Sequence, residues 1–281
     1  MYPYFEIFGR TIGSYAVCSF IGLLAASLVA WRLSKKISVP FEDIILIVLA
    51  VLAGMLIGGH LLYAITNYNK VLYCVAVITD KAKIGSLALS HIAEAIQICF
   101  GGMVFYGGFI GSATALFIFT KVVKYSFKKE ITDIFAVCVP LFHTFGRIGC
   151  FLGGCCYGVE SEFGFIAHND LIPEMSGVRR FPVSLVESLF NLLLFVVLLF
   201  LYNRNIQKSK LIFIYMIIYS IGRFVFEFFR GDEIRGVFFG LSTSQWISIL
   251  FFAVGIFAEI KVALRISTHC VAASSSNETK G

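Results

Sequence analysis

Two arginines, Arg147 and Arg223, lie inside long stretches of apolar residues. A charge at the centre of a membrane span costs about 2.5–3.5 kcal/mol even on the lenient insertion scale, so it usually faces the bundle interior and marks a functional site. The guanidinium is a planar fork of donors that matches phosphate oxygens and keeps its charge. The two residues therefore predict a shared, inward-facing site for the phosphate of a phospholipid headgroup. In the alternative, each arginine only pairs with Glu187 or Glu227 to fix the bundle.

Arg223 begins a polar stripe within an aromatic segment. Arg223, Glu227 and Arg230 are spaced i, i+4, i+7, which places them on one face of a helix. Glu227 would hold the guanidinium fork in place and offset part of its charge. We therefore expect Glu227 and Arg230 to take part in headgroup binding.

Arg147 shares a predicted helix face with His143, Cys150 and Gly154. Five glycines fall within 13 residues here, which allows close approach of a backbone or a ligand. They also predict a helix break near Gly154, where unpaired backbone groups need a polar cavity. His143 is a candidate general base for this cavity, and the alternative is a histidine that is simply satisfied in the interior.

Two cysteines, Cys155 and Cys156, follow the predicted break. Cys155 is a candidate nucleophile for a covalent intermediate, because a neighbouring arginine would favour its thiolate. The alternatives are a packing role, or a disulfide with Cys150 or another outer thiol. No two cysteines have the C-x-x-C spacing typical of zinc sites, so we expect neither a metal nor another cofactor.

Composition indicates an integral membrane protein. Of 281 residues, 58% are hydrophobic and 14% are charged, against roughly 25% charged residues in an ordinary soluble domain. A soluble enzyme, a disordered chain and a disulfide-stapled mini-protein are therefore excluded. The net charge of +6 does not indicate a nucleic-acid partner, because no basic tract is long enough and cytoplasmic loops of membrane proteins collect lysine and arginine.

Hydropathy predicts an all-α fold with seven transmembrane helices, since a spanning helix needs about 20 mostly apolar residues. The predicted spans are 14–33, 43–65, 102–122, 132–156, 183–203, 211–229 and 246–264. A shorter apolar stretch, 86–100, predicts a half-helix or an interfacial element. We expect a single membrane domain over residues 1–265 and a disordered cytoplasmic tail over 266–281.

The distribution of basic residues predicts the orientation of the bundle. With the N-terminus outside, the predicted cytoplasmic segments hold 13 lysines and arginines and the outer segments hold 8. The cytoplasmic loops are also the shorter ones, so their density of positive charge is higher still. The positive-inside rule therefore places the N-terminus outside and the C-terminus in the cytoplasm.

Several short motifs occur along the chain in a characteristic order. The main ones are Gly146-Arg147-Ile148-Gly149 with Gly154 and Gly158, and Gly222-Arg223 through Glu227-Phe228-Phe229-Arg230. The supporting ones are Gly58-Gly59, Gly101-Gly102-Met103, Gly107-Gly108, Gly111, Asp133, Pro182 with Glu187, and Ser244-Gln245. Over about residues 10–265, their order and spacing resemble those of the bacterial prolipoprotein diacylglyceryl transferases.

The resemblance implies a seven-span enzyme of the bacterial plasma (inner) membrane, with its active site facing the outer side. Such an enzyme moves the diacylglyceryl group of phosphatidylglycerol to the lipobox cysteine thiol of a prolipoprotein, and glycerol phosphate leaves. Arg147 and Arg223 would face the phosphate. We expect the following residues to contact the substrates: Glu227, Arg230, Gly107, Gly108, Gly154, Cys150, His60, Glu187 and Gln245.

Four positions depart from the family pattern. Tyr106 stands where the family has a histidine often regarded as the base, and a tyrosine with an ordinary pKa near 10 is a poor base at neutral pH. Tyr106 could instead orient the headgroup, or be an interfacial aromatic. Cys150 replaces an asparagine, Cys155-Cys156 replace a glutamate, and His60 replaces an arginine and is a second candidate base.

These departures leave two alternatives open. One is a paralogous transferase that uses a phospholipid donor and a non-lipoprotein acceptor, such as a glycan or another lipid. The other is a non-catalytic membrane protein that binds anionic lipid. The donor could also be another anionic phospholipid, and the acceptor another extracytoplasmic molecule.

Overall fold

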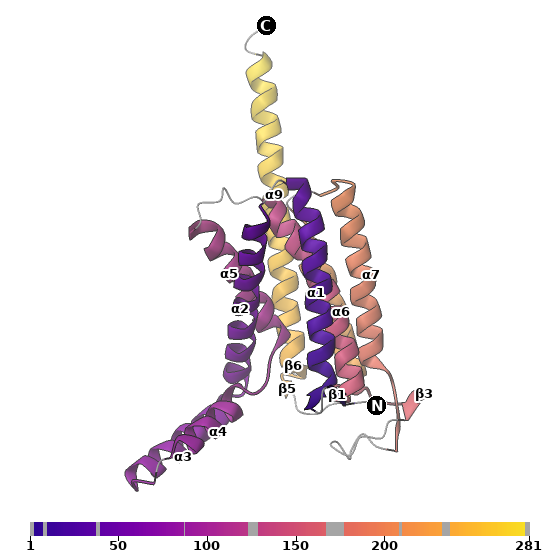
Figure 1. Ribbon diagram of the computed structural model, residues 1–281. Helices are drawn as coiled ribbons and strands as arrows, with labels where there is room; N and C mark the ends of the chain where they lie inside the picture. Colours follow the sequence, from indigo (N-terminus) through magenta and orange to yellow (C-terminus); the bar gives the residue numbers. More distant parts are fainter. Residues whose placement is uncertain are drawn as a thin grey trace. The chain divides into compact units, whose positions relative to one another are not determined.

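The computed structural model describes residues 3–7, 10–37, 40–86, 88–122, 129–166, 177–207, 210–231 and 237–278, with side chains as far as residue 261. The chain forms two compact units (Figure 1). Unit 1 is Met1–Ile37 together with Lys129–Gly281, and unit 2 is Ser38–Lys128.

Unit 1 is a bundle of apolar helices. Its members are α1 (Ser14–Ser34), α6 (Lys129–Gly153), α7 (Val183–Asn203), α8 (Leu211–Phe226) and α9 (Thr243–Glu278). Helix α6 packs against both α1 and α7, and α8 packs against α9 (Figure 1). Small residues allow the closest approach, since a side chain at Gly22 of α1 would press on Phe145 of α6. The packing of α6 carries Arg147 into the interior of the bundle.

Short strands and single 3-10 turns lie at the helix ends of unit 1. Three antiparallel pairs join β1 (Tyr4–Ile7) to β2 (Arg10–Gly13), β3 (Glu160–Ile166) to β4 (Arg179–Arg180), and β5 (Val237–Phe238) to β6 (Leu241–Ser242). The 3-10 turns are η1 (Lys35–Ile37) and η3 (Glu227–Phe229). Hydropathy did not predict these strands, because segments this short show no clear alternation of apolar and polar residues.

Unit 2 is built on the packing of α2 (Phe41–Thr66) against α5 (Phe105–Val122), while α3 (Tyr68–Lys83) and α4 (Leu89–Phe100) lie side by side. Glycines on both helices make the first of these contacts. A side chain at Gly111 would collide with the Gly54 carbonyl, and one at Gly107 would collide with the Gly58 carbonyl. The backbones of α2 and α5 therefore touch, as in other small-residue contacts between membrane helices.

The variant Gly111→Ala is expected to destabilise unit 2 by about 1–3 kcal/mol, the usual cost of adding a methyl group to a tightly packed contact. Thermal unfolding of the detergent-solubilised protein measures the loss. Gly146→Ala is the matched control, because a side chain at Gly146 meets nothing within 4 Å. That control should be neutral or gain up to about 1 kcal/mol, because alanine favours a helix. Equal stability of Gly111→Ala and the wild type would contradict the tight contact.

The helices confirm an all-α membrane protein. Six helices of the described residues are long and apolar enough to span a membrane, or up to seven if a bent pair forms one span. That pair joins Leu89–Phe100 to Phe105–Phe119 at an angle of 94°. It overlaps both the predicted half-helix, 86–100, and the predicted span 102–122. Helix α3 was not predicted, because its charged residues interrupt the apolar run.

Two predicted spans end earlier as α-helices than expected. The span 132–156 ends at Gly153, and in the span 211–229 the α-helix stops at Phe226 before the turn η3. The single membrane domain over 1–265 stays a prediction. So does the disordered tail over 266–281: helix α9 continues to Glu278, and residues 279–281 lie outside the described part of the chain.

Candidate active site

A stripe of polar side chains runs along the otherwise apolar helix α7. Ser184, Glu187, Ser188 and Asn191 are all buried in the bundle. Their spacing of three and four residues places them on one helix face. Asn191 donates a hydrogen bond of 2.7 Å to the Glu187 carbonyl, and Ser188 donates one of 3.1 Å to the Thr144 carbonyl of α6. The sequence shows this spacing, but of these four residues only Glu187 was predicted to belong to the site.

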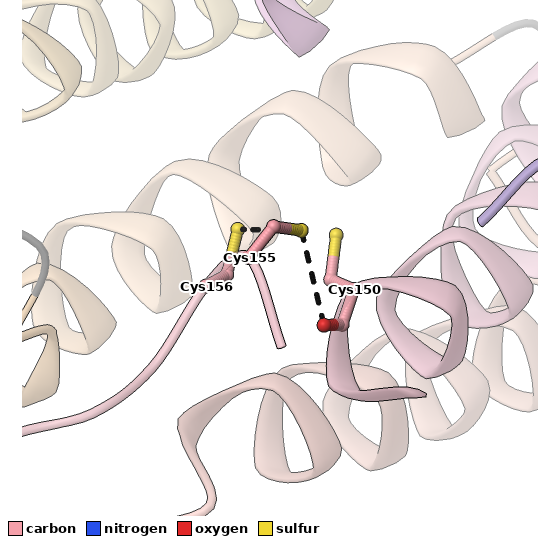
Figure 2. Close-up of side chains that lie close together, drawn as sticks. All are labelled: Cys150, Cys155 and Cys156. Carbon is pink, nitrogen blue, oxygen red and sulfur yellow. Dashed lines mark hydrogen bonds between the residues drawn. The ribbon is translucent and has the colours of Figure 1, made fainter. Parts of the chain in front are cut away.

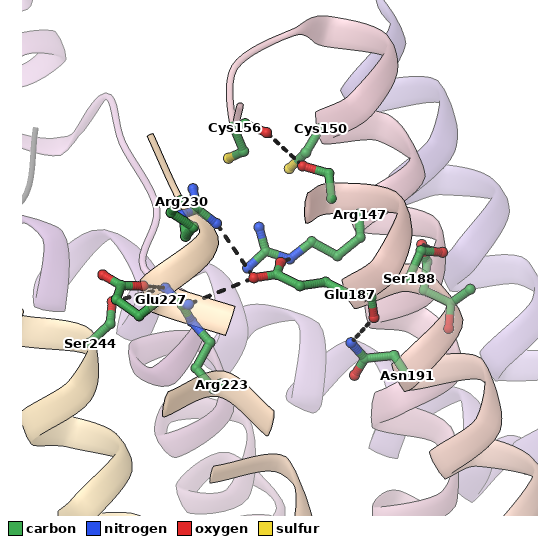
Figure 3. Close-up of polar contacts among 12 residues, drawn as sticks. Arg147, Cys150, Cys156, Glu187, Ser188, Asn191, Arg223, Glu227, Arg230 and Ser244 are labelled. Atoms are coloured by element: carbon green, nitrogen blue, oxygen red, sulfur yellow. Dashed lines mark hydrogen bonds and ion pairs between the residues drawn. The ribbon is translucent and has the colours of Figure 1, made fainter. Parts of the chain in front are cut away.

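Glu187 is the meeting point of three guanidinium groups (Figure 3). Its carboxylate is 2.6 Å from Nε of Arg147, and 3.7 Å from a terminal nitrogen of both Arg223 and Arg230. The Glu187 side chain is 3% exposed. The arginines come from α6, the end of α8 and the residue after η3, so three chain segments converge on one buried carboxylate.

Glu227 is the second carboxylate of this cluster. It lies 2.7 Å from Arg223, whose guanidinium also donates a hydrogen bond of 3.1 Å to the Ser244 hydroxyl. This pair confirms the expected i, i+4 contact. Three guanidinium groups against two carboxylates leave one net positive charge in the interior.

Arg230 reaches the cluster by a route other than the predicted continuous helix. The α-helix gives way to η3 after Phe226, and Arg230 has an extended backbone. It forms an isolated antiparallel bridge with Gly158, and the next amide, Gly231, donates a hydrogen bond of 3.0 Å to the Tyr157 carbonyl. The segment after the break in α6 therefore positions Arg230.

The space between the guanidinium groups is small. A narrow gap with no room for a water-sized molecule is lined by His143, Arg147, Glu187, Phe190, Asn191, Tyr219, Arg223 and Phe226. Ligand pockets for small molecules usually measure about 300–1,000 Å³. Arg147 and Arg223 therefore line the same gap, but the Glu187 carboxylate lies where a phosphate was expected, and their role as a phosphate site stays a prediction. The ion pairs with Glu187 and Glu227, left open as an alternative, are both present.

His143 lies beside this cluster. It lines the same gap as Arg147, and its ring is 5.4 Å from the ring of Tyr219 on α8. Its buried position fits both interpretations offered by the sequence, a base and an interior histidine. Its role as a base stays a prediction.

The predicted break in α6 is confirmed. The helix ends at Gly153, and Gly154 has a φ of +69°, a conformation that glycine adopts without strain. The turn folds Cys155 and Cys156 back toward Cys150, so that the three sulfur atoms lie within 4.8 Å of one another (Figure 2). Ser184 of α7 fixes the turn by donating a hydrogen bond of 2.7 Å to the Cys156 carbonyl.

The cysteines whose side chains the structure describes form no disulfide. Contacts with Cys150 and Cys155 hold the pKa of the Cys156 thiol well below its usual range, against the effect of burial. For Cys155, contact with Cys150 lowers the pKa, but contact with Cys156 and burial outweigh it and raise the pKa to about 11. The thiolate of this cluster is therefore favoured at Cys156 rather than at the predicted nucleophile Cys155.

Four predicted site residues belong to unit 2. Tyr106 is buried on α5, and Gly107 and Gly108 after it face α2, where Gly107 meets Gly58 and Gly108 meets Met55. The described contacts of these two glycines are packing contacts, and their part in headgroup binding stays a prediction.

His60 has a defined tautomer. Its Nδ1 lies 2.8 Å from the Gly102 carbonyl oxygen. A carbonyl oxygen only accepts, so in the neutral ring Nδ1 carries the hydrogen and Nε2 is the acceptor. This arrangement suits a base, although its part in the reaction stays a prediction.

Gln245 caps helix α9. Its side-chain oxygen accepts a hydrogen bond of 2.9 Å from the Ser242 amide, and its own amide donates one of 3.2 Å to the Ser242 hydroxyl. This is a capping box, which satisfies two amides at the helix start. Its side-chain nitrogen is buried and has no hydrogen-bond partner among the described residues. That nitrogen remains a donor for a ligand.

Comparisons with known proteins identify the same family over nearly the whole chain. Residues 3–260 match the family model described as prolipoprotein diacylglyceryl transferase. A phosphatidylglycerol–prolipoprotein diacylglyceryl transferase of Clostridium tetani is 34% identical over 256 residues, which cover 90% of this chain and 94% of that protein. A second such transferase, from Clostridium perfringens, is 35% identical over 255 residues, covering 89% and 91% of the two chains. One from Streptococcus mutans is 29% identical over 265 residues, with 92% of both chains covered.

Proposed function

Since the chain belongs to the prolipoprotein diacylglyceryl transferase family, we propose that it moves the diacylglyceryl group of phosphatidylglycerol to the lipobox cysteine of a prolipoprotein. The observation that carries the proposal is the buried cluster in which Arg147, Arg223 and Arg230 surround Glu187. Its one net positive charge matches the single negative charge of a phosphodiester. Guanidinium groups also match phosphate oxygens in geometry.

The reaction breaks one bond and forms one bond. The acceptor sulfur attacks the terminal glyceryl carbon of the diacylglyceryl group, the bond from that carbon to the phosphate oxygen breaks, and the thiol proton is released. The products are the thioether and glycerol phosphate. Negative charge increases on the leaving phosphate, so cations held in place there stabilise the transition state.

The guanidinium groups of Arg147 and Arg223 can bind the lipid phosphate only when that phosphate replaces the Glu187 carboxylate between them. The gap between Arg147 and Arg223 is too small for a headgroup while Glu187 bridges them. We infer that the lipid phosphate takes over part of the contacts of Glu187, and that Glu227 keeps Arg223 oriented meanwhile. Any phospholipid with an anionic phosphodiester could enter, so we propose that other anionic phospholipids be compared with phosphatidylglycerol as donors in the same assay.

Deprotonation of the acceptor thiol needs a further group. His143 lines the gap of the arginine cluster together with Arg147 and Arg223, within reach of a thiol that enters there. His60 has Nε2 as an acceptor, and a role of Tyr106 in orienting the headgroup stays a prediction. The variant His60→Gln, which keeps an amide donor for the Gly102 carbonyl, tests His60 as the base.

The active site is proposed to face the outer side of the plasma (inner) membrane of a bacterium. The positive-inside count places the N-terminus outside. In unit 1, β1 and β3 lie at one end of the bundle, and the last described turns of α9 lie at the other (Figure 1). A green fluorescent protein fused to the C-terminus should fluoresce, and alkaline phosphatase fused there should be inactive. The reverse pattern would contradict this orientation.

A reconstituted assay tests the function. Purified protein is supplied with phosphatidylglycerol labelled in its terminal glycerol, and with a lipobox peptide. Release of labelled glycerol phosphate that depends on the peptide, together with a peptide mass raised by one diacylglyceryl group, is the expected result. Release that needs a membrane extract and leaves the peptide unmodified would indicate a glycan or lipid acceptor. Tight lipid binding without release would indicate a non-catalytic protein. The comparisons favour neither of these alternatives.

A further inference from the structure

Three sulfur atoms gather at the end of α6, beside the arginine cluster. The sulfur of Cys155 is 3.8 Å from that of Cys156, and all three, including that of Cys150, lie within 4.8 Å of one another (Figure 2). Around a tetrahedral zinc ion with Zn–S bonds of about 2.3 Å, neighbouring sulfurs are about 3.8 Å apart. The thiols are thus already near the spacing that one shared metal ion requires.

The spacing of Cys150, Cys155 and Cys156 in the sequence does not indicate that their sulfur atoms lie together. Cys150 and Cys155 are separated by four residues, and the left-handed Gly154 between them reverses the chain. A bond between the adjacent Cys155 and Cys156 is disfavoured, because consecutive Cα atoms are about 3.8 Å apart and disulfides usually need about 4.4–6.8 Å. At most one pair with Cys150 could therefore oxidise without strain, whereas a metal ion can bind all three thiols.

We propose that Cys150, Cys155 and Cys156 bind a thiophilic metal ion, with Zn²⁺ as the reference ion, and that its fourth position receives the thiol of the acceptor. Soft thiolate ligands select such ions. Three protein ligands with one open position are the arrangement of catalytic zinc rather than structural zinc. Among the described residues, these three cysteines are the metal-ligating group that the structure brings together. The second half of the proposal rests on the proposed function.

The location of the site suits the reaction. A thiol bound to zinc loses its proton, so the acceptor sulfur would arrive as a thiolate without a separate base. Three thiolates and a bound acceptor thiolate around Zn²⁺ carry two net negative charges, and Arg147 and Arg230 both lie within electrostatic range of Cys156. Figure 3 shows Cys150 and Cys156 on the side of the cluster where these two arginines lie. The nucleophile and the leaving phosphate would thus be held next to each other.

The transfer step stays balanced with the metal present. The acceptor thiol gives its proton to solvent on binding Zn²⁺. Its sulfur then forms the bond to the glyceryl carbon as the bond from that carbon to phosphate breaks. The thioether is a weaker ligand than the thiolate, so it leaves the ion, which remains bound by the three cysteines. No oxidation or reduction takes place.

Metal binding is tested first, without any assay of activity. The full-length protein is purified with a phosphine reductant, stripped with a chelator, and titrated with Zn²⁺ or Co²⁺ alone. We expect one ion per chain and, with Co²⁺, the intense absorption of thiolate-to-metal charge transfer. Cys155→Ser should weaken binding by more than the roughly 10–100-fold that loss of an outer-shell partner costs. Cys155 is exposed, so its replacement leaves the core intact.

Two further cysteines provide the control. Cys74 and Cys99 form a buried cluster in unit 2, and Cys74→Ser should leave the Co²⁺ spectrum unchanged. If the fully reduced wild type binds neither ion, or if Cys155→Ser binds as tightly as the wild type, the metal site is excluded. A disulfide between Cys150 and one of the other two cysteines would compete with metal binding. It would be detected as a loss of two hydrogens in the intact mass of the protein before reduction.

The acceptor position is tested with the Co²⁺ protein and a lipobox peptide. We expect the charge-transfer band to grow on addition of the peptide, and not on addition of the same peptide with serine in place of cysteine. Transfer that continues at the full rate in metal-stripped protein would overturn the metal inference and leave the transferase function standing. Metal binding without any transfer would overturn the transferase function and leave the metal site standing.

Discussion

Arg147→Ala is expected to lower kcat for glycerol phosphate release by about 10²–10³, the usual effect of removing one preorganised donor from a developing oxyanion. Arg147 is the guanidinium that lies closest to Glu187, at 2.6 Å, and it comes from the helix that packs between α1 and α7. Its position is therefore set by the packing of the bundle. Arg223→Ala should have an effect of the same order, since Arg223 also pairs with Glu187.

The variant Arg147→Lys separates the effect of the positive charge of Arg147 from the effect of its planar shape. Arg147→Lys keeps one positive charge but loses the planar fork, so it should recover only part of the rate. Arg204→Ala is the matched control, because Arg204 lies at the exposed end of α7 against the ring of Phe200. It should keep the rate of the wild type. Normal rates in both Arg147→Ala and Arg223→Ala would exclude the phosphate clamp.

The arginine site shows how far the sequence predicts this fold. A charge within an apolar span costs so much that Arg147 and Arg223 had to be interior and partnered. The identity of the shared partner could not be predicted, because Glu187 and Glu227 were equally available by sequence. The choice depends on which faces of α6, α7 and α8 meet, and that is a property of packing. Arg230 likewise depends on its bridge to Gly158, a contact between distant segments.

The cysteine cluster was less predictable for a different reason. The break near Gly154 was predicted from glycine density, and the structure confirms it. The direction in which the chain leaves the break was not, because it depends on the positive φ of Gly154 and on the hydrogen bond from Ser184. Spacing rules such as C-x-x-C describe cysteines on one short turn, so they miss a cluster that joins the last turn of a helix to the residues after its glycine end.

Glu187→Ala is expected to destabilise the protein by about 3–5 kcal/mol, the range found when one member of a buried ion pair is removed. The loss should lie toward the upper end, because three guanidinium groups would then face one another with Glu227 as the remaining carboxylate of the cluster. Chemical unfolding of the detergent-solubilised protein measures the change. Glu160→Gln is the matched control, since the Glu160 carboxylate is exposed and 3.8 Å from Arg180, and its effect should stay within about 0.5 kcal/mol.

A double replacement distinguishes a structural carboxylate from one that also serves the reaction. Replacing Arg147 and Glu187 together with methionine removes one cation with the anion, and apolar residues often replace a buried pair at little cost. The double variant should therefore be more stable than Glu187→Met alone, a coupling that a double-mutant cycle quantifies. Its activity should stay as low as that of Arg147→Ala, because the clamp lacks a guanidinium. If the double variant recovered both stability and turnover, the ion pair would serve the bundle alone, and the phosphate would have to bind elsewhere.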